Sequence, residues 1–232
     1  MTIGKGTSGR VSTGTGSTGT GSAAPIARPE LVARIARAAL ELAAGPGAVR
    51  VAVDGPVTED ARGLAGEIVA AIAAVGRPAA GVHAEDFLRA RSLRLEYGTD
   101  AEAYYQRWYD LAALRREVLD PVDPDGPGRY LPRLRDPRTD RPYRDPAVAA
   151  PPGLVLVVDG RFLADWDLAG AFDLTVLLEV SPAALARRLP DAEREPVAGA
   201  WRRYLDDCDP AGRADLVVRF DHPDRPALVG SP

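Results

Sequence analysis

Residues 153–160, GLVLVVDG, form the most hydrophobic run in this chain and constrain its fold more than any other segment. The five consecutive apolar side chains of this run leave no position for a polar, solvent-facing side. The pattern therefore predicts a strand that is buried on both faces. Such strands lie in the middle of parallel sheets that carry helices on both sides. The run predicts an α/β protein.

Four further segments have the composition of strands, and helical patterns separate them. Strands that alternate with helices form parallel sheets with right-handed crossovers. We therefore predict a single three-layer α/β domain over residues 28–232, built on a mostly parallel, five-stranded sheet. The other four strands are expected within 49–54, 79–87, 172–180 and 214–220.

Apolar spacing and capping residues locate the helices. Leu31, Ile35 and Ala39 recur at helical spacing, which predicts a helix with one buried face. Ser181 followed by Pro182 is a favourable helix start, because serine caps well and proline suits the first helical position. Helices are also expected where Leu64, Ile68, Ile72 and Val75 share one face, over 110–122 and over 195–206, with an ordered excursion over 123–152.

The first 27 residues differ from the rest of the chain in composition. As far as residue 24 they are almost entirely Gly, Ser and Thr. Such a segment cannot bury enough apolar surface to offset the entropy lost on ordering. We predict that residues 1–27 form a disordered tail.

Charge and composition narrow the range of partners. The formal net charge is −4, and an acidic protein gives no reason to expect nucleic-acid or membrane binding. No apolar run approaches the roughly 18 residues that cross a bilayer. Cys208 is the only cysteine, so neither a disulfide framework nor a cysteine metal site is expected. We expect a cytoplasmic protein that binds a small molecule.

Polar residues follow several of the predicted strands at the point where each strand ends. Asp54 with Gly55 ends the first, and Asp159 with Gly160 ends the most hydrophobic one. Ligands of parallel α/β sheets bind beyond the carboxyl ends of the strands. Any single Asp-Gly pair has a simpler explanation, because both residues favour turns. Two such pairs on the two most buried strands favour a ligand site.

The order of several short motifs resembles the uridine kinase branch of the P-loop nucleoside kinases. The resemblance extends over about residues 48–229. It implies a P-loop NTPase domain of the nucleoside kinase type, which phosphorylates uridine, cytidine or a similar small alcohol with ATP and Mg²⁺. The motifs are VAVDG, EDF, TDAEAYY before DLAALR, RDPRTDRP, LVVDGRFL, ALARRL, RRYL and ADLVVRFDHPDRPALV.

This resemblance implies catalytic and acceptor-binding roles for particular residues. Glu85 takes the position of the aspartate that activates the nucleoside hydroxyl, and Asp86 beside it is a second candidate base. Asp159 takes the second acidic position and would bind Mg²⁺. Asp100 and Tyr104 fall where the family contacts the sugar or base. Tyr104 has an alternative role in simple packing.

The resemblance also implies residues for the phosphate groups of ATP. Gly55 and Arg62 lie in the phosphate loop, and Arg187 and Arg203 lie in the lid region. Arginines in a lid neutralise the transferring phosphoryl group. The alternative for both lid arginines is a solvated helix face.

The phosphate loop departs from its usual pattern, GxxxxGK[ST], in which glycines, a lysine and a hydroxyl hold the phosphates and Mg²⁺. Counted from Gly55, the second glycine is Asp60, the lysine is Ala61 and the hydroxyl residue is Arg62. Glu59 and Asp60 stand where a triphosphate should rest. Carboxylates are themselves stabilised at a helix N-terminus, so they can occupy the anion site.

Two hypotheses about function remain open at this point. In one, the protein is a nucleoside kinase in which Arg62 replaces the lysine, with phosphotransfer weakened. In the other, it is a non-catalytic binding or regulatory protein that keeps the acceptor pocket and needs no cofactor. The changed loop favours the second hypothesis.

Overall fold

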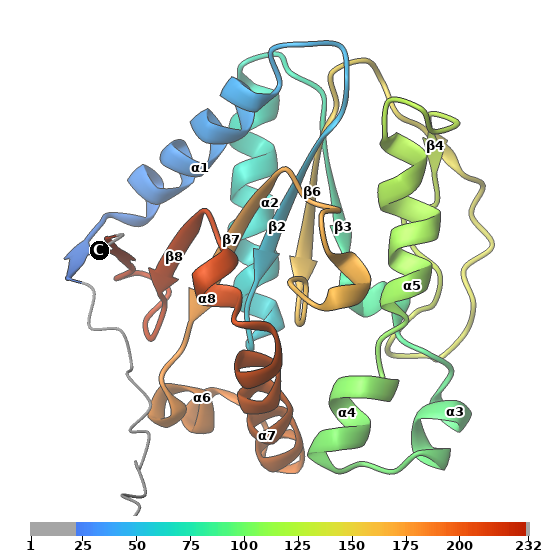
Figure 1. Ribbon diagram of the computed structural model, residues 1–232, viewed down its shortest axis with the longest axis vertical. Helices are drawn as coiled ribbons and strands as arrows, with labels where there is room; N and C mark the ends of the chain where they lie inside the picture. The colour runs from blue at the N-terminus through green and yellow to red at the C-terminus, as the bar shows by residue number, and fades with distance from the viewer. Residues whose placement is uncertain (1–21, 231–232) are drawn as a thin grey trace, which may run out of the picture.

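The computed structural model describes residues 22–230 of the 232-residue chain. A twisted sheet lies between two layers of helices, with α1 and α2 on one face and α4, α5 and α7 on the other (Figure 1). The sheet has the order β1-β9-β8-β7-β2-β6-β3. The strands are β1 Ala23–Pro25, β2 Val49–Asp54, β3 Ala79–His83, β6 Val155–Gly160, β7 Leu174–Glu179, β8 Leu216–Arg219 and β9 Ala227–Val229.

The five predicted strands are the parallel part of this sheet, in the order β8-β7-β2-β6-β3. The sheet nevertheless has seven strands rather than five, because β9 and β1 extend one edge in antiparallel fashion. Residues 1–21 of the predicted tail lie outside the described residues. The end of that segment was wrongly assigned, since Ala23 pairs with Val229 and the amide of Ile26 donates to the Pro226 carbonyl.

The helices fill the connections between the parallel strands. The helix predicted from the spacing of Leu31 and Ile35 is confirmed and begins at Arg28. The helix start predicted at Pro182 is also confirmed, and the Ser181 side chain accepts a hydrogen bond from the Ala184 amide at 3.3 Å. The helices are α1 Arg28–Leu42, α2 Thr58–Ala74, α3 Arg91–Glu96, α4 Ala101–Arg107, α5 Leu111–Leu114, α6 Pro182–Arg188, α7 Asp191–Cys208 and α8 Pro210–Arg213.

The helix predicted over 110–122 changes its hydrogen-bonding pattern along its length. Asp110 caps α5 by accepting from the Ala113 amide, and the helix continues as a π-helix over Arg115–Leu119 and a 3-10 turn over Asp120–Val122. Further 3-10 turns are Ala84–Phe87 and Trp166–Leu168. The predicted excursion contains a short hairpin, β4 Arg129–Tyr130 with β5 Val148–Ala149.

The core has two layers, one on each face of the sheet. The spacing of Leu31, Ile35 and Ala39 places all three in the layer beneath α1 and α2, where they are fully buried. The layer on the other face is rich in aromatic rings, with Phe162 and Tyr204 at its centre. Among the described residues, no helix has the length and apolar character needed to cross a membrane.

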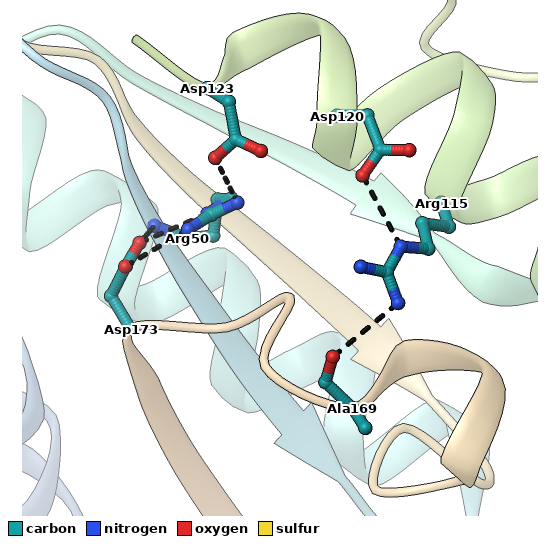
Figure 2. A network of polar contacts seen from close by, with 6 residues as sticks. All are labelled: Arg50, Arg115, Asp120, Asp123, Ala169 and Asp173. Atoms are coloured by element: carbon teal, nitrogen blue, oxygen red, sulfur yellow. Dashed lines mark hydrogen bonds and ion pairs between the residues drawn. The ribbon is translucent and has the colours of Figure 1, made fainter. Parts of the chain in front are cut away.

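A polar network ties the segment after α5 to the sheet (Figure 2). Arg50 of β2 donates to both carboxylate oxygens of Asp173 at 3.1 Å and also pairs with Asp123. Arg115 donates to Asp120 at 3.3 Å and to the Ala169 carbonyl at 3.4 Å. These bonds lie at the amino end of β2, away from the strand ends described next.

Candidate functional site

The carboxyl ends of β2, β3 and β6 meet at the edge of the sheet where α2 begins. Parallel pairing sets Asp54 opposite Gly160 and His83 opposite Asp159. The Gly55 amide donates to the Gly160 carbonyl at 2.9 Å. A side chain at Gly160 would bring its Cβ within 2.5 Å of the Cβ of Ala84. The glycine therefore allows the end of β6 to lie directly against the turn after β3.

The loop after β2 is shorter than its sequence pattern predicts. Helix α2 begins at Thr58, so only two residues separate Gly55 from the helix. Glu59 and Asp60 therefore belong to its first turn. The Asp60 carboxylate forms an ion pair with Arg188 of α6, and both side chains are more than four-fifths buried. Arg188 also donates to the Phe220 carbonyl at 2.9 Å, which fixes the guanidinium over the helix start.

Glu85 lies between two guanidinium groups beyond the end of β3. Its Oε1 is 3.8 Å from Arg161, and its Oε2 is 3.8 Å from Arg62. Burial raises the pKa of Glu85 against the opposing effect of Arg161. The carboxylate is therefore held in a site where both its neighbours compensate its charge.

Arg161 is the centre of this cluster, and its side chain is only 4% exposed. Its Nε donates to the Pro56 carbonyl at 2.8 Å, and its Nη1 donates to the Tyr104 hydroxyl at 2.6 Å. A weaker contact of 3.4 Å joins Nη1 to the Tyr109 hydroxyl. A single buried cation thus connects the loop after β2 with Glu85 and with the aromatic layer.

Asp159 and His83 form a second polar pair next to Glu85. The His83 Nδ1 lies 2.6 Å from the Asp159 Oδ1, and Asp159 is buried. Asp86 is almost fully buried close by, and burial raises the pKa of its carboxyl. Within residues 22–230, no group of three or more His, Cys, Asp or Glu side chains is arranged to hold a metal ion.

Comparison with known proteins identifies the fold. No protein-family model matches the chain, and no curated protein matches it. A solved structure of a possible uridine kinase from Bacillus stearothermophilus matches with a TM-score of 0.65 and 20% identity, over 81% of this chain and 98% of that one. A protein assigned as a fructose transport system kinase from a Silicibacter species matches with a TM-score of 0.51 and 23% identity, over 78% and 90%. This chain has the P-loop kinase fold.

The P-loop kinase fold brings several of the predicted residues together. Glu85, Asp86 and Asp159 lie at the same sheet edge, as the parallel strand ends predicted. Tyr104 joins them through Arg161, so its hydroxyl is already bonded within the protein. Arg62 faces Glu85 from α2.

Three predicted residues lie elsewhere in this P-loop kinase fold. Asp100 is exposed and caps α4 by accepting from the Ala103 amide at 2.8 Å. Arg203 lies on the surface of α7, where it pairs with Glu102 and, at 3.5 Å, with Asp207. Arg187 is exposed on α6, and it is its neighbour Arg188 that reaches the loop. The phosphate-binding roles of Arg187 and Arg203 stay predictions.

Sequence reasoning missed the buried residues that organise the site. Tyr204 of α7 donates to Asp54, and its oxygen accepts from the Ala164 amide at 2.8 Å. Burial raises the pKa of Asp54 to about 7. Asp54 and Arg161 each adjoin a glycine in the motifs VAVDG and LVVDGR, which is the one signal that could have found them.

Proposed function

We propose that this protein binds a small polar molecule of the nucleoside or sugar class at the carboxyl ends of β3 and β6. We further propose that it transfers phosphate from ATP weakly or not at all. One observation carries the second statement: in the first turn of α2, next to the place where a phosphate loop holds its anion, the Asp60 carboxylate forms an ion pair with Arg188.

The residues at the start of α2 do not fit Mg·ATP in the manner of a phosphate loop. Ala61 supplies no ammonium group and Arg62 supplies no hydroxyl for Mg²⁺. Arg188, a cation that faces the start of α2, is already paired with the Asp60 carboxylate, so the pair offers little net charge to a phosphate.

The groups at the carboxyl ends of β3 and β6, called the acceptor side from here on, support the proposal that the protein binds a small polar molecule. Hydrogen-bonding groups from three segments converge there, and ligand sites are typically built from a few such groups beside an apolar layer. Glu85 and His83 remain partly exposed while Arg161 and Asp159 are buried behind them. The structural neighbours are described as a uridine kinase and a fructose transport system kinase, which favours a ligand that carries several hydroxyl groups.

A second candidate function is slow phosphotransfer. Arg62 and Arg161 each lie 3.8 Å from Glu85, so two cations stand close to the position of a transferring phosphoryl group. In this alternative, one of them replaces the missing lysine and Glu85 activates the acceptor hydroxyl.

Thermal stability in the presence of Mg·ATP tests whether the start of α2, called the donor site from here on, binds a nucleotide. A ligand that binds only the folded protein stabilises it by RT ln(1 + [L]/Kd), about 2.7 kcal/mol at 100 times Kd. We expect no change in melting temperature at millimolar Mg·ATP. A saturable shift with a micromolar Kd would show that the donor site is open and would favour the second candidate.

Calorimetry without ATP tests the acceptor site. Uridine, cytidine, ribose and fructose form the panel, and at least one of them is expected to bind. The matched variant is Glu85→Gln, which keeps the size of the side chain and removes its charge, and it should weaken that binding. If none of the four compounds gives heat with the natural protein, the binding half of the proposal is wrong.

A further inference from the structure

His83 and Asp159 form a pair to which the sequence resemblance gives no joint role. They are register partners at the ends of the neighbouring strands β3 and β6. The distance from Nδ1 to Oδ1 is 2.6 Å, a short and well-formed hydrogen bond. The Asp159 side chain is 3% exposed, whereas that of His83 is 34% exposed. The histidine therefore connects a buried carboxylate to the open edge of the site.

The hydrogen bond determines which nitrogen of the ring carries the proton. An ionised carboxylate can only accept, so Nδ1 must be the donor. In the neutral imidazole, the other nitrogen, Nε2, is then an acceptor with a free lone pair. Because Nδ1 faces the buried carboxylate, the exposed part of the ring is its opposite side, which carries Nε2.

The other charged groups around His83 are already engaged or more deeply buried. Glu85 lies between Arg62 and Arg161, and Arg133 donates to Asp145 at 2.5 Å. Asp86 interacts electrostatically with His83, Arg62 and Arg133 but is almost fully buried. The His83 ring is partly exposed and is held in one orientation by its contact with the buried Asp159.

We propose that His83 is the residue that recognises a hydroxyl group of the bound ligand, and that Asp159 positions it by holding Nδ1. The Nε2 atom accepts a hydrogen bond from the hydroxyl. The choice of a hydroxyl-bearing ligand rests on the proposed function. The position of the proton on the ring is independent of the proposed function.

The protonation pattern can be measured without a ligand. The chain has two histidines, His83 and His222, so a long-range ¹H–¹⁵N correlation spectrum contains two imidazoles, and His222→Gln assigns them. At neutral pH, His83 is expected to carry its proton on Nδ1, and Asp159→Asn to shift the ring toward the Nε2–H form. A natural protein in which His83 carries its proton on Nε2 would overturn the proposal.

Ligand binding tests the role of the ring. Affinity for uridine or ribose is measured by calorimetry at one fixed pH. His83→Gln is expected to weaken binding about tenfold, while His222→Gln has no effect.

The two ways of failing are distinguishable. If the natural protein binds a nucleoside or sugar and His83→Gln binds it equally well, the recognition role of His83 is wrong and the proposed function stands. If the natural protein binds none of the compounds, the proposed function fails and the ligand role of His83 fails with it. Loss of the folded state in Asp159→Asn leaves the His83→Gln comparison intact.

Discussion

Two regions at one edge of the sheet use carboxylates in opposite ways. At the start of α2, Asp60 forms an ion pair with Arg188, and both side chains are largely buried. At the ends of β3 and β6, Glu85 and His83 are backed by the buried Arg161 and Asp159 and stay partly exposed. The first arrangement satisfies a charge within the protein. The second presents polar groups to a ligand.

The difference follows from local geometry. A carboxylate in the first turn of a helix is stabilised by the helix dipole, typically by 0.3–1 kcal/mol, so Asp60 gains from the interaction that would otherwise bind a phosphate. Beyond β3 and β6, in contrast, the polar side chains follow strand ends, and their partners come from the neighbouring strand or its loop. The two regions therefore differ in how far their charged side chains are open to solvent.

The largest expected effect comes from removing the cation that organises the acceptor side. Arg161→Met leaves Glu85, Tyr104 and the Pro56 carbonyl without their buried donor. Breaking a buried ion pair in this way costs about 3–5 kcal/mol, and urea unfolding should show a loss of that size. Arg203→Met, on the surface of α7, is the control and should cost under about 1 kcal/mol. Equal losses in the two variants would contradict the central role of Arg161.

The second effect concerns Asp54, which links the loop region to α7 through Tyr204. Burial raises its pKa to about 7 from an ordinary value of 3.8. The folded state therefore binds more protons than the unfolded state between pH 4 and pH 7, and this contribution to stability is lost as pH rises through that window. The full difference is up to about 4 kcal/mol.

The test compares urea unfolding of the natural protein and Asp54→Asn at pH 4.5 and pH 7.5. The natural protein should lose more stability between the two values than the variant does. Glu85 and Asp86, whose pKa values burial also raises, contribute with the same sign in both proteins and cancel in the difference. Identical pH dependence in the two proteins would show that Asp54 does not titrate in this window.

The parallel part of the fold could be predicted because its strands lie in largely apolar segments that helical patterns separate. The two additional strands could not, since β1 and β9 have three residues each and their pairing depends on contacts between the ends of the described chain. The meeting of Glu85, Asp86 and Asp159 could also be predicted, because the carboxyl ends of parallel strands lie at one edge.

The remaining parts of the site depend on angles that a sequence pattern does not give. Successive residues of a helix point about 100° apart, so the choice between Arg187 and Arg188 rests on where α6 begins. Phe162, the residue after Arg161, has a backbone in the left-handed region with φ of 67°. For a bulky residue this conformation is an outlier, and no sequence motif predicts it.

The third effect is a gain of nucleotide affinity when the residues at the start of α2 are changed to those of a phosphate loop. The variant Glu59→Ala, Asp60→Gly, Ala61→Lys, Arg62→Thr restores the glycine, the lysine and the hydroxyl, and it frees Arg188 from its partner. Affinity for Mg·ATP should rise at least tenfold, about 1.4 kcal/mol, because hydrogen bonds to charged groups contribute about 1.5–3 kcal/mol. Asp60→Ala alone is the control for loss of the carboxylate. If the natural protein phosphorylates uridine as fast as the fourfold variant, the residues at the start of α2 do not prevent ATP binding.

The smallest effect belongs to Arg62, and it separates the two candidate functions. Arg62 is 44% exposed and 3.8 Å from Glu85, so as a surface pair it contributes under about 1 kcal/mol to stability. If the donor site is closed, Arg62→Gln leaves both stability and the response to Mg·ATP nearly unchanged. If Arg62 replaces the lysine of a phosphate loop, the same change should lower any measurable affinity for Mg·ATP at least tenfold, because it removes the charge that faces the phosphates. Calorimetry on Arg62→Gln and on the exposed control Arg187→Gln, side by side with the natural protein, distinguishes a cation that only screens Glu85 from one that holds a nucleotide.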